Sequence, residues 1–262
     1  MTNDENELRG EVRENEADKD KIVGRNTVIE ALRSGREIDR ILVAKGATNL
    51  GKLFAMAKDS GVPVKEVAPI KIDELAAGAN AQGVVAFAAA AKYAELEDVF
   101  ALAKEKGEPP FIIIADGLED GHNLGAIIRT AECCGAHGVI IPKRRSVGLN
   151  YVVAKTTAGA TEYVPVVRVT NIVRTLEELK ERGVWIFGAD MDGEPLWQSD
   201  FSGAVGLVVG AEGEGVSRLV KEKCDFVVSL PMRGKIESLN ASVAASVMMY
   251  EVARQRIGIK AR

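Results

Sequence analysis

The chain has 262 residues, of which 47% are hydrophobic and 27% are charged. This composition suits a soluble globular protein of one or two domains and excludes a chain that is disordered throughout. The longest apolar runs, such as Phe111–Ala115, are far too short to span a bilayer, and no apolar signal segment follows Met1. Three cysteines without metal-ligand spacing predict reduced thiols, no metal site and a cytoplasmic protein.

The charges are unevenly distributed along the chain. The net charge is -4, but residues 1–20 hold eight acidic and three basic side chains, a net of -5. Residues 21–262 therefore carry 31 basic against 30 acidic side chains, a net of +1. Because residues 1–20 have few apolar groups, we expect a disordered acidic tail without a specific role. The rest is close to neutral, so local basic clusters are more informative about a nucleic-acid partner than the total charge.

Short helices and short strands alternate over residues 21–91, which predicts a small α/β domain. The expected elements are helices near Thr27–Arg33 and Leu50–Ser60 and strands at Ile38–Val43, Val62–Val67 and Gly83–Ala89.

Residues 92–110 are expected to link this domain to a second one, because a charged helical stretch there ends in Gly107 and the pair Pro109-Pro110. Residues 111–262 contain six apolar strand candidates, most of them separated by helical segments. Such alternation predicts a mainly parallel sheet covered on both faces, with ligands beyond the carboxyl ends of the strands. The strand candidates are Phe111–Ala115, Gly138–Ile141, Val164–Val169, Val184–Ala189, Val205–Val209 and Phe226–Leu230.

Three polar segments follow strands of this second domain. The first, Asp116–Ala131, leaves a strand through a glycine-containing loop and enters a helix that Asn123 is suited to cap. Arg129 lies within the second helical turn, so its long side chain can reach back toward the loop, where it would suit a phosphate or ribose. A surface ion pair with Glu132 explains Arg129 equally well.

The second segment, Gly210–Ser217, has three glycines that allow a ligand close to the backbone. Its G-x-x-G-x-G spacing differs from the G-x-G-x-x-G of dinucleotide-binding folds, and Asp225 is too close to serve as their ribose-binding acid, so a nicotinamide-dependent enzyme is disfavoured. P-loop and zinc-peptidase signatures do not occur in the sequence. His122 and His137 offer no catalytic triad, and His137 is expected to be structural.

The third segment, Leu230–Ala241, joins a strand to a long amphipathic helix. Pro231 cannot continue a sheet ladder, Gly234 permits backbone angles closed to other residues, and Ser238 and Asn240 are suited to cap the helix. Because any strand-to-helix connection needs a turn and a cap, this segment is informative only together with the other two.

A basic cluster, Lys143-Arg144-Arg145, follows the strand candidate Gly138–Ile141. It is placed where it could meet phosphates, although a basic loop considered alone is more often simply solvated.

Together the segments resemble the SpoU (TrmH-like) RNA ribose 2'-O-methyltransferases of the SPOUT superfamily. The motifs occur in the family's order: Asn123-x-Gly125-x-x-x-Arg129-Thr130-Ala131, then Gly210-x-Glu212-x-x-Gly215-Val216-Ser217, then Pro231-Met232-x-Gly234-x-x-x-Ser238-Leu239-Asn240-x-Ser242.

The front domain is similar to the family's small RNA-binding domain, which resembles ribosomal protein L30e. The matching residues are Gly24-Arg25-Asn26-Thr27-Val28-Ile29-Glu30-Ala31-Leu32 and Gln82-Gly83-Val84. The resemblance covers residues 21–257, and the two-domain layout is most like the ribosomal RNA branch of the family. One departure is Ala81, where that branch often has His.

This resemblance implies the fold and the cofactor. Residues 21–91 would form an L30e-like RNA substrate-binding domain, and residues 111–262 a SPOUT methyltransferase domain with a parallel sheet and a C-terminal trefoil knot, an exception to the rule that folds are unknotted. The implied cofactor is S-adenosylmethionine, and no metal is required. The cofactor-binding residues carried over are Gly210, Leu230, Met232 and Leu239.

The resemblance also implies methyl transfer to a ribose 2'-hydroxyl. Arg129 is the family's key catalytic residue, and because a guanidinium stays protonated in a protein, we expect it to fix a phosphate and polarise the hydroxyl. The residues expected to orient Arg129 and the ribose are Asn123, Glu212, Ser238 and Asn240. RNA contacts are expected at Arg25, Gln82, Lys143, Arg144 and Arg145.

The most specific function implied is methylation of a guanosine of 23S rRNA by a homodimer joined through the knotted domain. A tRNA ribose methyltransferase is the first alternative. A non-catalytic RNA-binding protein is the second, and the intact Arg129, Glu212 and Asn240 argue against it.

Overall fold

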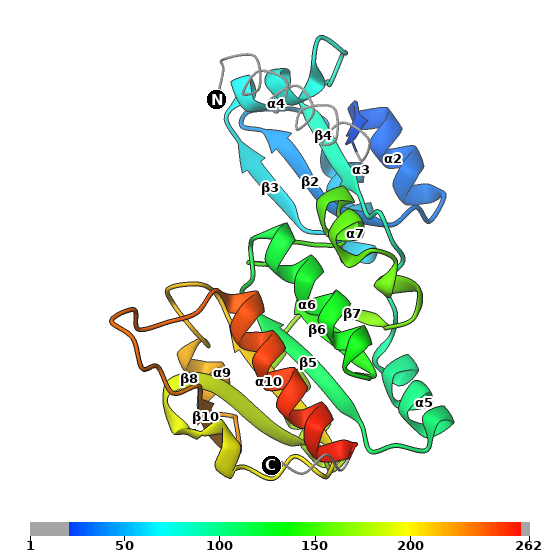
Figure 1. Ribbon diagram of the computed structural model, residues 1–262. Helices are drawn as coiled ribbons and strands as arrows, with labels where there is room; N and C mark the ends of the chain where they lie inside the picture. Colours follow the sequence, from blue (N-terminus) through cyan, green and yellow to red (C-terminus); the bar gives the residue numbers. More distant parts are fainter. Residues whose placement is uncertain (1–20, 258–262) are drawn as a thin grey trace. The chain divides into compact units, whose positions relative to one another are not determined.

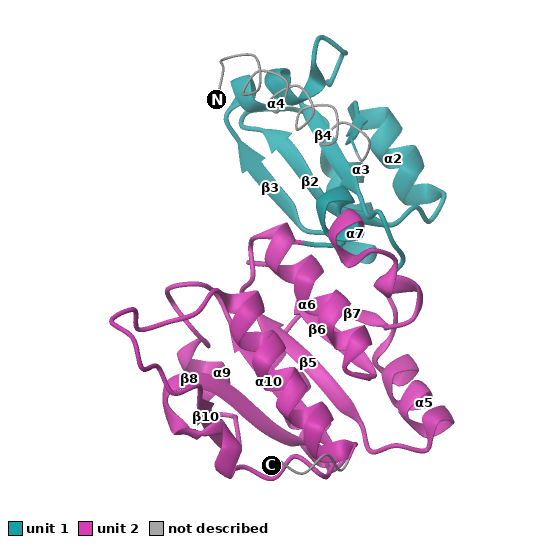
Figure 2. Ribbon diagram, in the orientation of Figure 1, with its two compact units in different colours: residues 1–92, 148–154 teal, residues 93–147, 155–262 magenta. Residues whose placement is uncertain are grey.

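The computed structural model describes residues 21–257, which form two compact units (Figure 1, Figure 2). Unit 1 contains the described residues up to Lys92 together with Gly148–Ala154, and unit 2 contains Tyr93–Val147 and the described residues from Lys155 onward. The acidic tail expected at residues 1–20 lies outside the described residues.

Unit 1 is an α/β domain on a four-stranded sheet with the order β1-β4-β2-β3. Strand β2 pairs in parallel with β3 and antiparallel with β4, and β4 pairs antiparallel with β1. Val28, Leu32 and Leu53 of its helices are buried in the core. The elements are β1 (Lys21–Val23), α2 (Arg25–Arg33), β2 (Ile38–Ala44), α3 (Gly51–Asp59), β3 (Val64–Val67), α4 (Pro69–Ala76) and β4 (Val84–Ala88).

Three features of unit 1 are not predicted from the sequence pattern. Strand β1 has only three residues, too few to show a period. Helix α4 begins at Pro69, a position that favours proline because its missing N–H would have no partner there. Gly148–Ala154 joins unit 1 from a distant part of the chain, and a side chain at Gly148 would overlap the Asp39 carboxylate.

Unit 2 is built on a six-stranded sheet in which every pair is parallel, with the order β10-β8-β9-β5-β6-β7. The predicted parallel sheet is thus confirmed. The strands are β5 (Phe111–Asp116), β6 (Gly138–Pro142), β7 (Val166–Val169), β8 (Trp185–Pro195), β9 (Val205–Gly210) and β10 (Phe226–Ser229). The helices are α5 (Leu96–Lys106), α6 (Gly121–Cys133), α7 (Tyr151–Thr157), η1 (Ala160–Glu162), α8 (Ile172–Glu181), η2 (Leu196–Gln198), α9 (Arg218–Lys221) and α10 (Ala241–Arg256); helix α7 begins in unit 1 and ends in unit 2.

Helices cover the sheet of unit 2. Apolar residues of α5, α8 and α9 share one core cluster with Ile112 and Ile114 of β5. Helices α6 and α10 lie side by side in front of the sheet in Figure 1. The two helices are in contact, because the hydroxyls of Thr130 in α6 and Ser246 in α10 are 3.1 Å apart. Residues 93–110 are part of this unit rather than a free connector, because α5 buries Val99 completely against the sheet.

The strand order places a topological switch point between β5 and β9. From β5 the chain runs outward through β6 and β7, then crosses to the other half of the sheet, where β9 returns to pair with β5. Asp116 and Gly210, the last residues of these two strands, are register partners. The loops that follow them therefore leave the same edge of the sheet in opposite directions, which is where ligands bind in open α/β sheets.

His137 is a buried titratable group in the core of unit 2. Its side chain is completely buried, and its Nδ1 accepts a hydrogen bond of 3.0 Å from the backbone N–H of Phe111. Burial, aided by the positive charge of Lys106 and opposed by Glu108, lowers the pKa of His137 to about 4. Since Nδ1 must stay unprotonated to accept, the neutral imidazole is the form that the fold requires.

We predict that acid weakens the fold through His137. Between pH 6.5 and 4 the unfolded chain binds more protons at this group than the folded chain, so stability falls as the pH falls. Lowering the pH from about 7 to about 5 should remove about 2 kcal/mol from the free energy of unfolding. Urea unfolding at both pH values measures the loss, which should be about 2 kcal/mol smaller in His137→Gln. His122→Gln, at an exposed position, should behave as the parent, and equal losses in all three proteins would contradict the assignment.

Candidate functional site

Two cavities open at the carboxyl edge of the sheet of unit 2. The first, which we call the acidic cavity, has a volume of roughly 680 Å³, and four carboxylates but no Lys, Arg or His line it. This lining suits a ligand that is in part apolar and in part positively charged. The lining residues are Ala189, Asp190, Met191, Val209, Gly210, Ala211, Glu212, Gly213, Glu214, Gly215, Leu230, Met232, Glu237, Ser238, Leu239, Asn240, Ala241, Ala244 and Met248.

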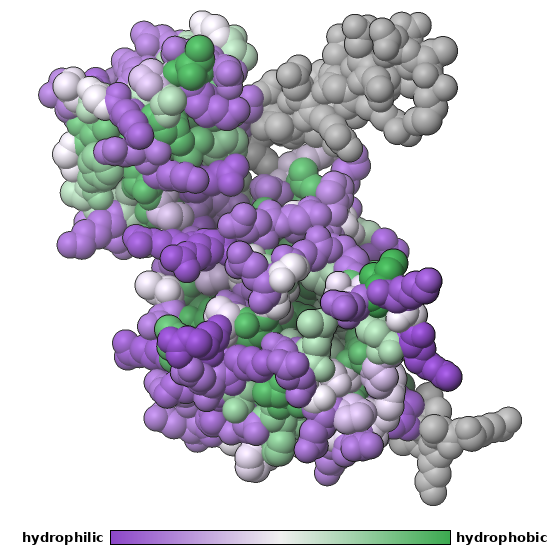
Figure 3. Space-filling view, turned by 90° about the vertical axis from the view of Figure 1, so that its left-hand side faces the viewer, coloured by the Kyte–Doolittle hydropathy of each residue, from purple (hydrophilic) through white to green (hydrophobic). Residues whose placement is uncertain are grey.

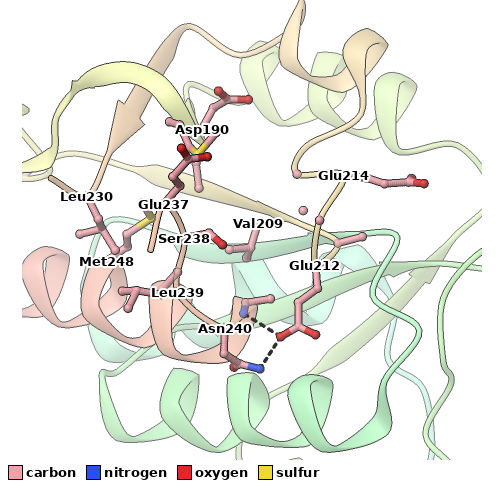
Figure 4. A pocket seen from close by; sticks show the side chains of 18 of the residues that line it. Asp190, Val209, Glu212, Glu214, Leu230, Glu237, Ser238, Leu239, Asn240 and Met248 are labelled. Atoms are coloured by element: carbon pink, nitrogen blue, oxygen red, sulfur yellow. Dashed lines mark hydrogen bonds between the residues drawn. The ribbon is translucent and has the colours of Figure 1, made fainter. Parts of the chain in front are cut away.

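All four residues expected to bind the cofactor, Gly210, Leu230, Met232 and Leu239, line the acidic cavity. Gly210 is the last residue of β9, and the other three come from the segment between β10 and α10. Figure 4 shows Leu230 and Leu239 on one side of the cavity together with Met248 of α10.

A tight turn at Ala211–Gly215 forms one wall of the acidic cavity. Ala211 and Gly215 exchange two backbone hydrogen bonds of 3.1 and 2.9 Å, and Gly213 and Gly215 have positive φ angles of 80° and 67°. The turn folds back so closely on β9 that a side chain at Gly210 would overlap the backbone of Gly215. Position 210 therefore requires glycine, because the backbone of Gly215 lies too close for any side chain there.

Strand β8 contributes to the cavity through a bulge. Gly188 pairs with Val227 and Glu194 with Val228, so residues 189–193 loop out of the ladder. This brings Asp190 to the cavity, where Lys221 Nζ lies 2.9 Å from its carboxylate. Burial opposes ionisation of Asp190, but the hydrogen bond and charge of Lys221 outweigh it, so the pKa of Asp190 lies below its ordinary value. The acid is thus ionised and fixed in position.

Three of the predicted catalytic residues form one polar network. The side-chain amide of Asn240 donates to Oδ1 of Asn123 at 3.0 Å and also to Oε1 of Glu212. The backbone N–H of Ala241 donates to the same Glu212 oxygen at 3.4 Å. Figure 4 shows the Glu212 side chain directed toward Asn240, whereas that of Glu214 extends away from it. The network joins residues that are more than 100 positions apart in the chain.

Asn240 is also the N-cap of α10. Its Oδ1 accepts from the N–H groups of Ser242 at 3.0 Å and Val243 at 3.3 Å. The cap fixes which end of the amide is oxygen, so the NH₂ group must face Asn123 and Glu212. Ser238 lines the cavity two residues earlier but is not the cap.

The prediction that Asn123 caps α6 is wrong. The helix begins two residues earlier, and Asp120 is its N-cap, accepting from His122 N at 2.8 Å. Asn123 lies within the first turn instead and is 6% exposed. Its side chain is therefore turned inward, where its Oδ1 accepts the hydrogen bond from the Asn240 amide.

Arg129 projects from α6, the helix that also supplies Asn123, and is exposed. Its side chain lines neither cavity and makes no ion pair with Glu132 or any other residue between 21 and 257. The structure of one chain thus leaves the guanidinium available to an external partner, and does not place it in the Asn123–Glu212–Asn240 network.

The second cavity, which we call the arginine cavity, has a volume of roughly 740 Å³. It holds Arg144 and Arg145 of the predicted RNA-binding cluster, while Lys143 is not in its lining. The turn Ala211–Gly215, which includes Glu212, lies between it and the acidic cavity and lines both. Its lining residues are Asp116, Gly117, Leu118, Glu119, Asp120, Asn123, Pro142, Arg144, Arg145, Ala211, Glu212, Glu214, Gly215, Val216, Ser217 and Arg218.

The two RNA-contact residues expected in unit 1, Arg25 at the start of α2 and Gln82 in the loop before β4, lie near the end of β2 and the segment that follows it. Arg25 Nη1 donates to the carbonyl of Thr48 at 3.3 Å. Gln82 has a positive φ of 49° and precedes Gly83, whose carbonyl accepts from Ala44 N at 2.8 Å. Ala81, the departure from the family pattern, is buried and packs beside Ile72, Ala76 and Val85. The small side chain at 81 is thus part of a core.

Asp190 and Met248 of the acidic cavity were outside the sequence prediction for different reasons. Asp190 directly follows the predicted strand Val184–Ala189, so the rule that ligands gather at strand ends would have found it. Met248 lies in the middle of α10, where its spacing does not differ from that of ordinary core residues.

The fold and the paired cavities define the class of protein. A parallel α/β sheet with two cavities at its switch point is typical of an enzyme that binds its ligands beyond the carboxyl ends of the strands.

Comparison with known sequences identifies the family. The SpoU rRNA Methylase family matches residues 110–250, and the RNA 2'-O ribose methyltransferase substrate-binding domain matches residues 21–94. The chain is 50% identical over 240 residues to the Bacillus subtilis (strain 168) protein YacO, assigned to the TrmH family of tRNA/rRNA methyltransferases, covering 90% of this chain and 96% of that protein. A Staphylococcus saprophyticus relative assigned to the same family is 47% identical over 247 residues, or 92% and 98% of the two chains. The chain belongs to the SpoU family of RNA 2'-O-ribose methyltransferases.

Solved structures share the fold. The SpoU methyltransferase AviRb from Streptomyces viridochromogenes, solved in complex with AdoMet, superimposes with a TM-score of 0.59 at 24% identity over 91% of this chain and 90% of that one. The A. aeolicus TrmH/SpoU tRNA modifying enzyme superimposes with a TM-score of 0.53 at 30% identity, covering 62% of this chain and 84% of that one. Both proteins share the fold of this chain over those lengths, and the AdoMet in the first structure is a ligand of AviRb.

The acidic cavity fits S-adenosylmethionine. Gly210 and the glycine turn let the backbone approach closely, and Leu230, Leu239 and Met248 offer apolar surface. The carboxylates and the absence of basic residues from the lining match the positive charge of a sulfonium. No helix between residues 21 and 257 is long and apolar enough to cross a membrane, and those residues contain no group of three or more His, Cys, Asp or Glu arranged to hold a metal.

We predict that Gly210→Ala displaces the glycine turn. The added methyl group would overlap Gly215, so stability should fall by roughly 1–3 kcal/mol and the Kd for S-adenosylmethionine should rise at least about tenfold. Isothermal titration calorimetry and thermal unfolding measure the two effects. Gly203→Ala, at a position with open space and no positive φ, is the matched control and should bind the cofactor as the parent does. Normal cofactor affinity in Gly210→Ala would show that the turn is not part of the cofactor site.

Proposed function

We propose that this enzyme methylates the 2'-hydroxyl of a guanosine in 23S rRNA. The observation that carries the proposal is the Asn123–Glu212–Asn240 network, which stands between a cavity that fits the methyl donor and a cavity that contains arginines. The layout of the chain supports the ribosomal RNA branch represented by the 23S rRNA guanosine-2'-O-methyltransferase RlmB. The names of the relatives mention both tRNA and rRNA and do not distinguish between the two substrates.

The network would orient the reacting ribose. S-adenosylmethionine, when bound, supplies an electrophilic methyl group on a positively charged sulfur. Glu212 accepts both protein hydrogen bonds on Oε1, so its second oxygen is left to accept from a ribose hydroxyl. Because Asn240 is held by its role as helix cap, this geometry is in place before RNA arrives.

Arg129 would complete the acceptor site. It is exposed, unpaired among the described residues, and on the same helix as Asn123. A guanidinium stays charged and presents several donors in a plane, so its role would be to hold an RNA phosphate and polarise the 2'-hydroxyl rather than to act as a base. Ser238 lines the acidic cavity without a hydrogen bond to another described residue and would contact the ligand from the donor side.

The segment that links β10 to α10 would carry the trefoil knot. Strand β10 is at the edge of the sheet, yet the segment after it lines the same cavity as the loop after β9, and α10 packs beside α6. This return across the sheet supports a threaded path. Arg25 and Gln82 of unit 1, which would be the L30e-like domain, would contact structured RNA together with Lys143, Arg144 and Arg145.

The function is tested by methyl transfer to RNA. We expect the protein to transfer labelled methyl from S-adenosylmethionine to 23S rRNA from cells that lack it, and ribose mapping to find one 2'-O-methylguanosine. In the same assay Arg129→Ala should lose at least about 100-fold in rate, because the positioned cation stabilises charge in the transition state, with cofactor affinity within about twofold of the parent. Label in tRNA instead would overturn the rRNA assignment, and a large loss of cofactor affinity in Arg129→Ala would refute its acceptor-side role.

We also propose that the enzyme is a homodimer through unit 2. Val243, Val247 and Tyr250 form an exposed apolar strip on α10, being 48%, 37% and 56% exposed at helical spacing. Figure 3 shows another face, on which hydrophilic residues predominate and apolar ones are scattered between them. A continuous strip on one helix is the better candidate for an interface.

Val247→Glu should convert the dimer into a monomer, because a carboxylate would be buried without a partner at the interface. Light scattering after size-exclusion chromatography measures the mass. Ile70→Glu, at a 69% exposed position in unit 1, is the control and should leave the mass unchanged. A parent protein that is monomeric, or a Val247→Glu variant that stays dimeric, would contradict this interface.

A further inference from the structure

Arg218 lines the arginine cavity from a part of the chain that the sequence prediction leaves without a role. It is the first residue of α9 and comes directly after the glycine turn and Val216-Ser217. The backbone N–H of Ser217 donates to Asp116 Oδ2 at 2.9 Å, which ties the start of α9 to the end of β5. Arg218 therefore projects from an anchored position rather than from a free loop.

The loop that carries Arg144 and Arg145 is anchored at both of its ends. Lys143 N donates to the carbonyl of Val169 at 2.8 Å. On the other side, Ser146 Oγ and Val147 N both donate to the carbonyl of Leu118, at 3.1 and 2.8 Å. The two arginines are thus held at the tip of a short loop that is pinned to the segment after β5.

Arg145 has a backbone conformation that costs free energy. Its φ is +57°, in the left-handed region that residues other than glycine rarely adopt. Such a conformation persists where the surrounding structure imposes it, and it is concentrated at ligand sites. Here it directs successive residues of the loop to the cavity, and glycine at 145 would relieve the backbone but remove the charge.

The cavity is also lined by five carboxylates, those of Asp116, Glu119, Asp120, Glu212 and Glu214, but none of them forms an ion pair with Arg144, Arg145 or Arg218. Asp116 accepts from Ser217 N, Asp120 accepts from His122 N, and Glu212 accepts from Asn240. Neither Arg144 nor Arg145 forms an ion pair with another described residue, and Arg218 pairs only with Glu222, the C-cap of α9, with side chains 78% and 54% exposed. An exposed pair of this kind contributes little and exchanges readily for a phosphate.

We propose that Arg144, Arg145 and Arg218 form an arginine clamp that binds the phosphodiester backbone of an unstacked RNA nucleotide and delivers its ribose to the Asn123–Glu212 wall. The clamp rests on the proposed function, and it assigns Arg218 as an RNA-binding residue. A cavity of roughly 740 Å³ accepts one nucleotide but not a stacked helix, so the substrate class is a nucleotide splayed from a loop, a bulge or a single strand. Guanidinium groups suit this task because they bind phosphate oxygens bidentately.

The clamp is tested by the salt dependence of RNA binding. The probe is an unmodified 23S rRNA transcript, and its Kd is measured for the full-length protein over a series of salt concentrations. Each lost phosphate contact should make the plot of log Kd against log salt less steep by about 0.7 to 0.9. We expect that change in Arg218→Ala, together with a Kd about fivefold higher at about 0.1 M salt and unchanged affinity for S-adenosylmethionine.

Two further variants keep the test specific. Arg174→Ala removes an exposed arginine of α8 that lines neither cavity, and it should reproduce the parent's slope. Arg218→Lys keeps the charge and should recover most of the slope but not the full affinity. Parental slope and Kd in Arg218→Ala, or an equal change in Arg174→Ala, would overturn the clamp. Failure of the proposed function is distinguishable, because it would appear as absent methyl transfer by the parent protein.

Discussion

The side-chain amide of Asn240 is the contact on which the site depends. Its oxygen caps α10, and its nitrogen holds Asn123 of α6 and Glu212 of the turn after β9. Three segments that are distant in sequence are therefore fixed relative to one another by one planar group. Since an amide cannot exchange its two ends without losing both sets of hydrogen bonds, helix capping and the orientation of the acidic group are a single structural requirement.

The sheet explains why these segments meet. Parallel strands deliver their carboxyl ends to one edge, and the switch between β5 and β9 leaves room there for two cavities. The strands themselves are buried and apolar, so nearly all polar chemistry is left to the loops. The bulge in β8 adds Asp190 without disturbing the rest of the ladder, and Lys221 keeps that acid ionised. The position of Asp190 in the site thus depends on the bulge and on its ion pair with Lys221, and not on the sequence motifs of the family.

The sequence predicted the parallel sheet and the family, because apolar runs and spaced motifs are local signals. It did not predict that Asn123 faces inward, since capping preference at Asp120 and at Asn123 is similar and only tertiary contact with Asn240 decides between them. The inclusion of Gly148–Ala154 in unit 1 likewise depends on a long-range contact. The role proposed for Arg218 was not predicted either, because the sequence does not show that the start of α9 and the loop that carries Arg144 and Arg145 line the same cavity.

The turn Ala211–Gly215 belongs to both cavities. Its two backbone hydrogen bonds close the five residues into one turn, so a displacement of the turn would change the lining of both cavities. By linkage, a ligand that shifts the turn changes the affinity of the opposite cavity by the same factor that the opposite ligand exerts on it. A methyl donor and an RNA that occupied the two cavities would therefore be coupled through this one five-residue turn.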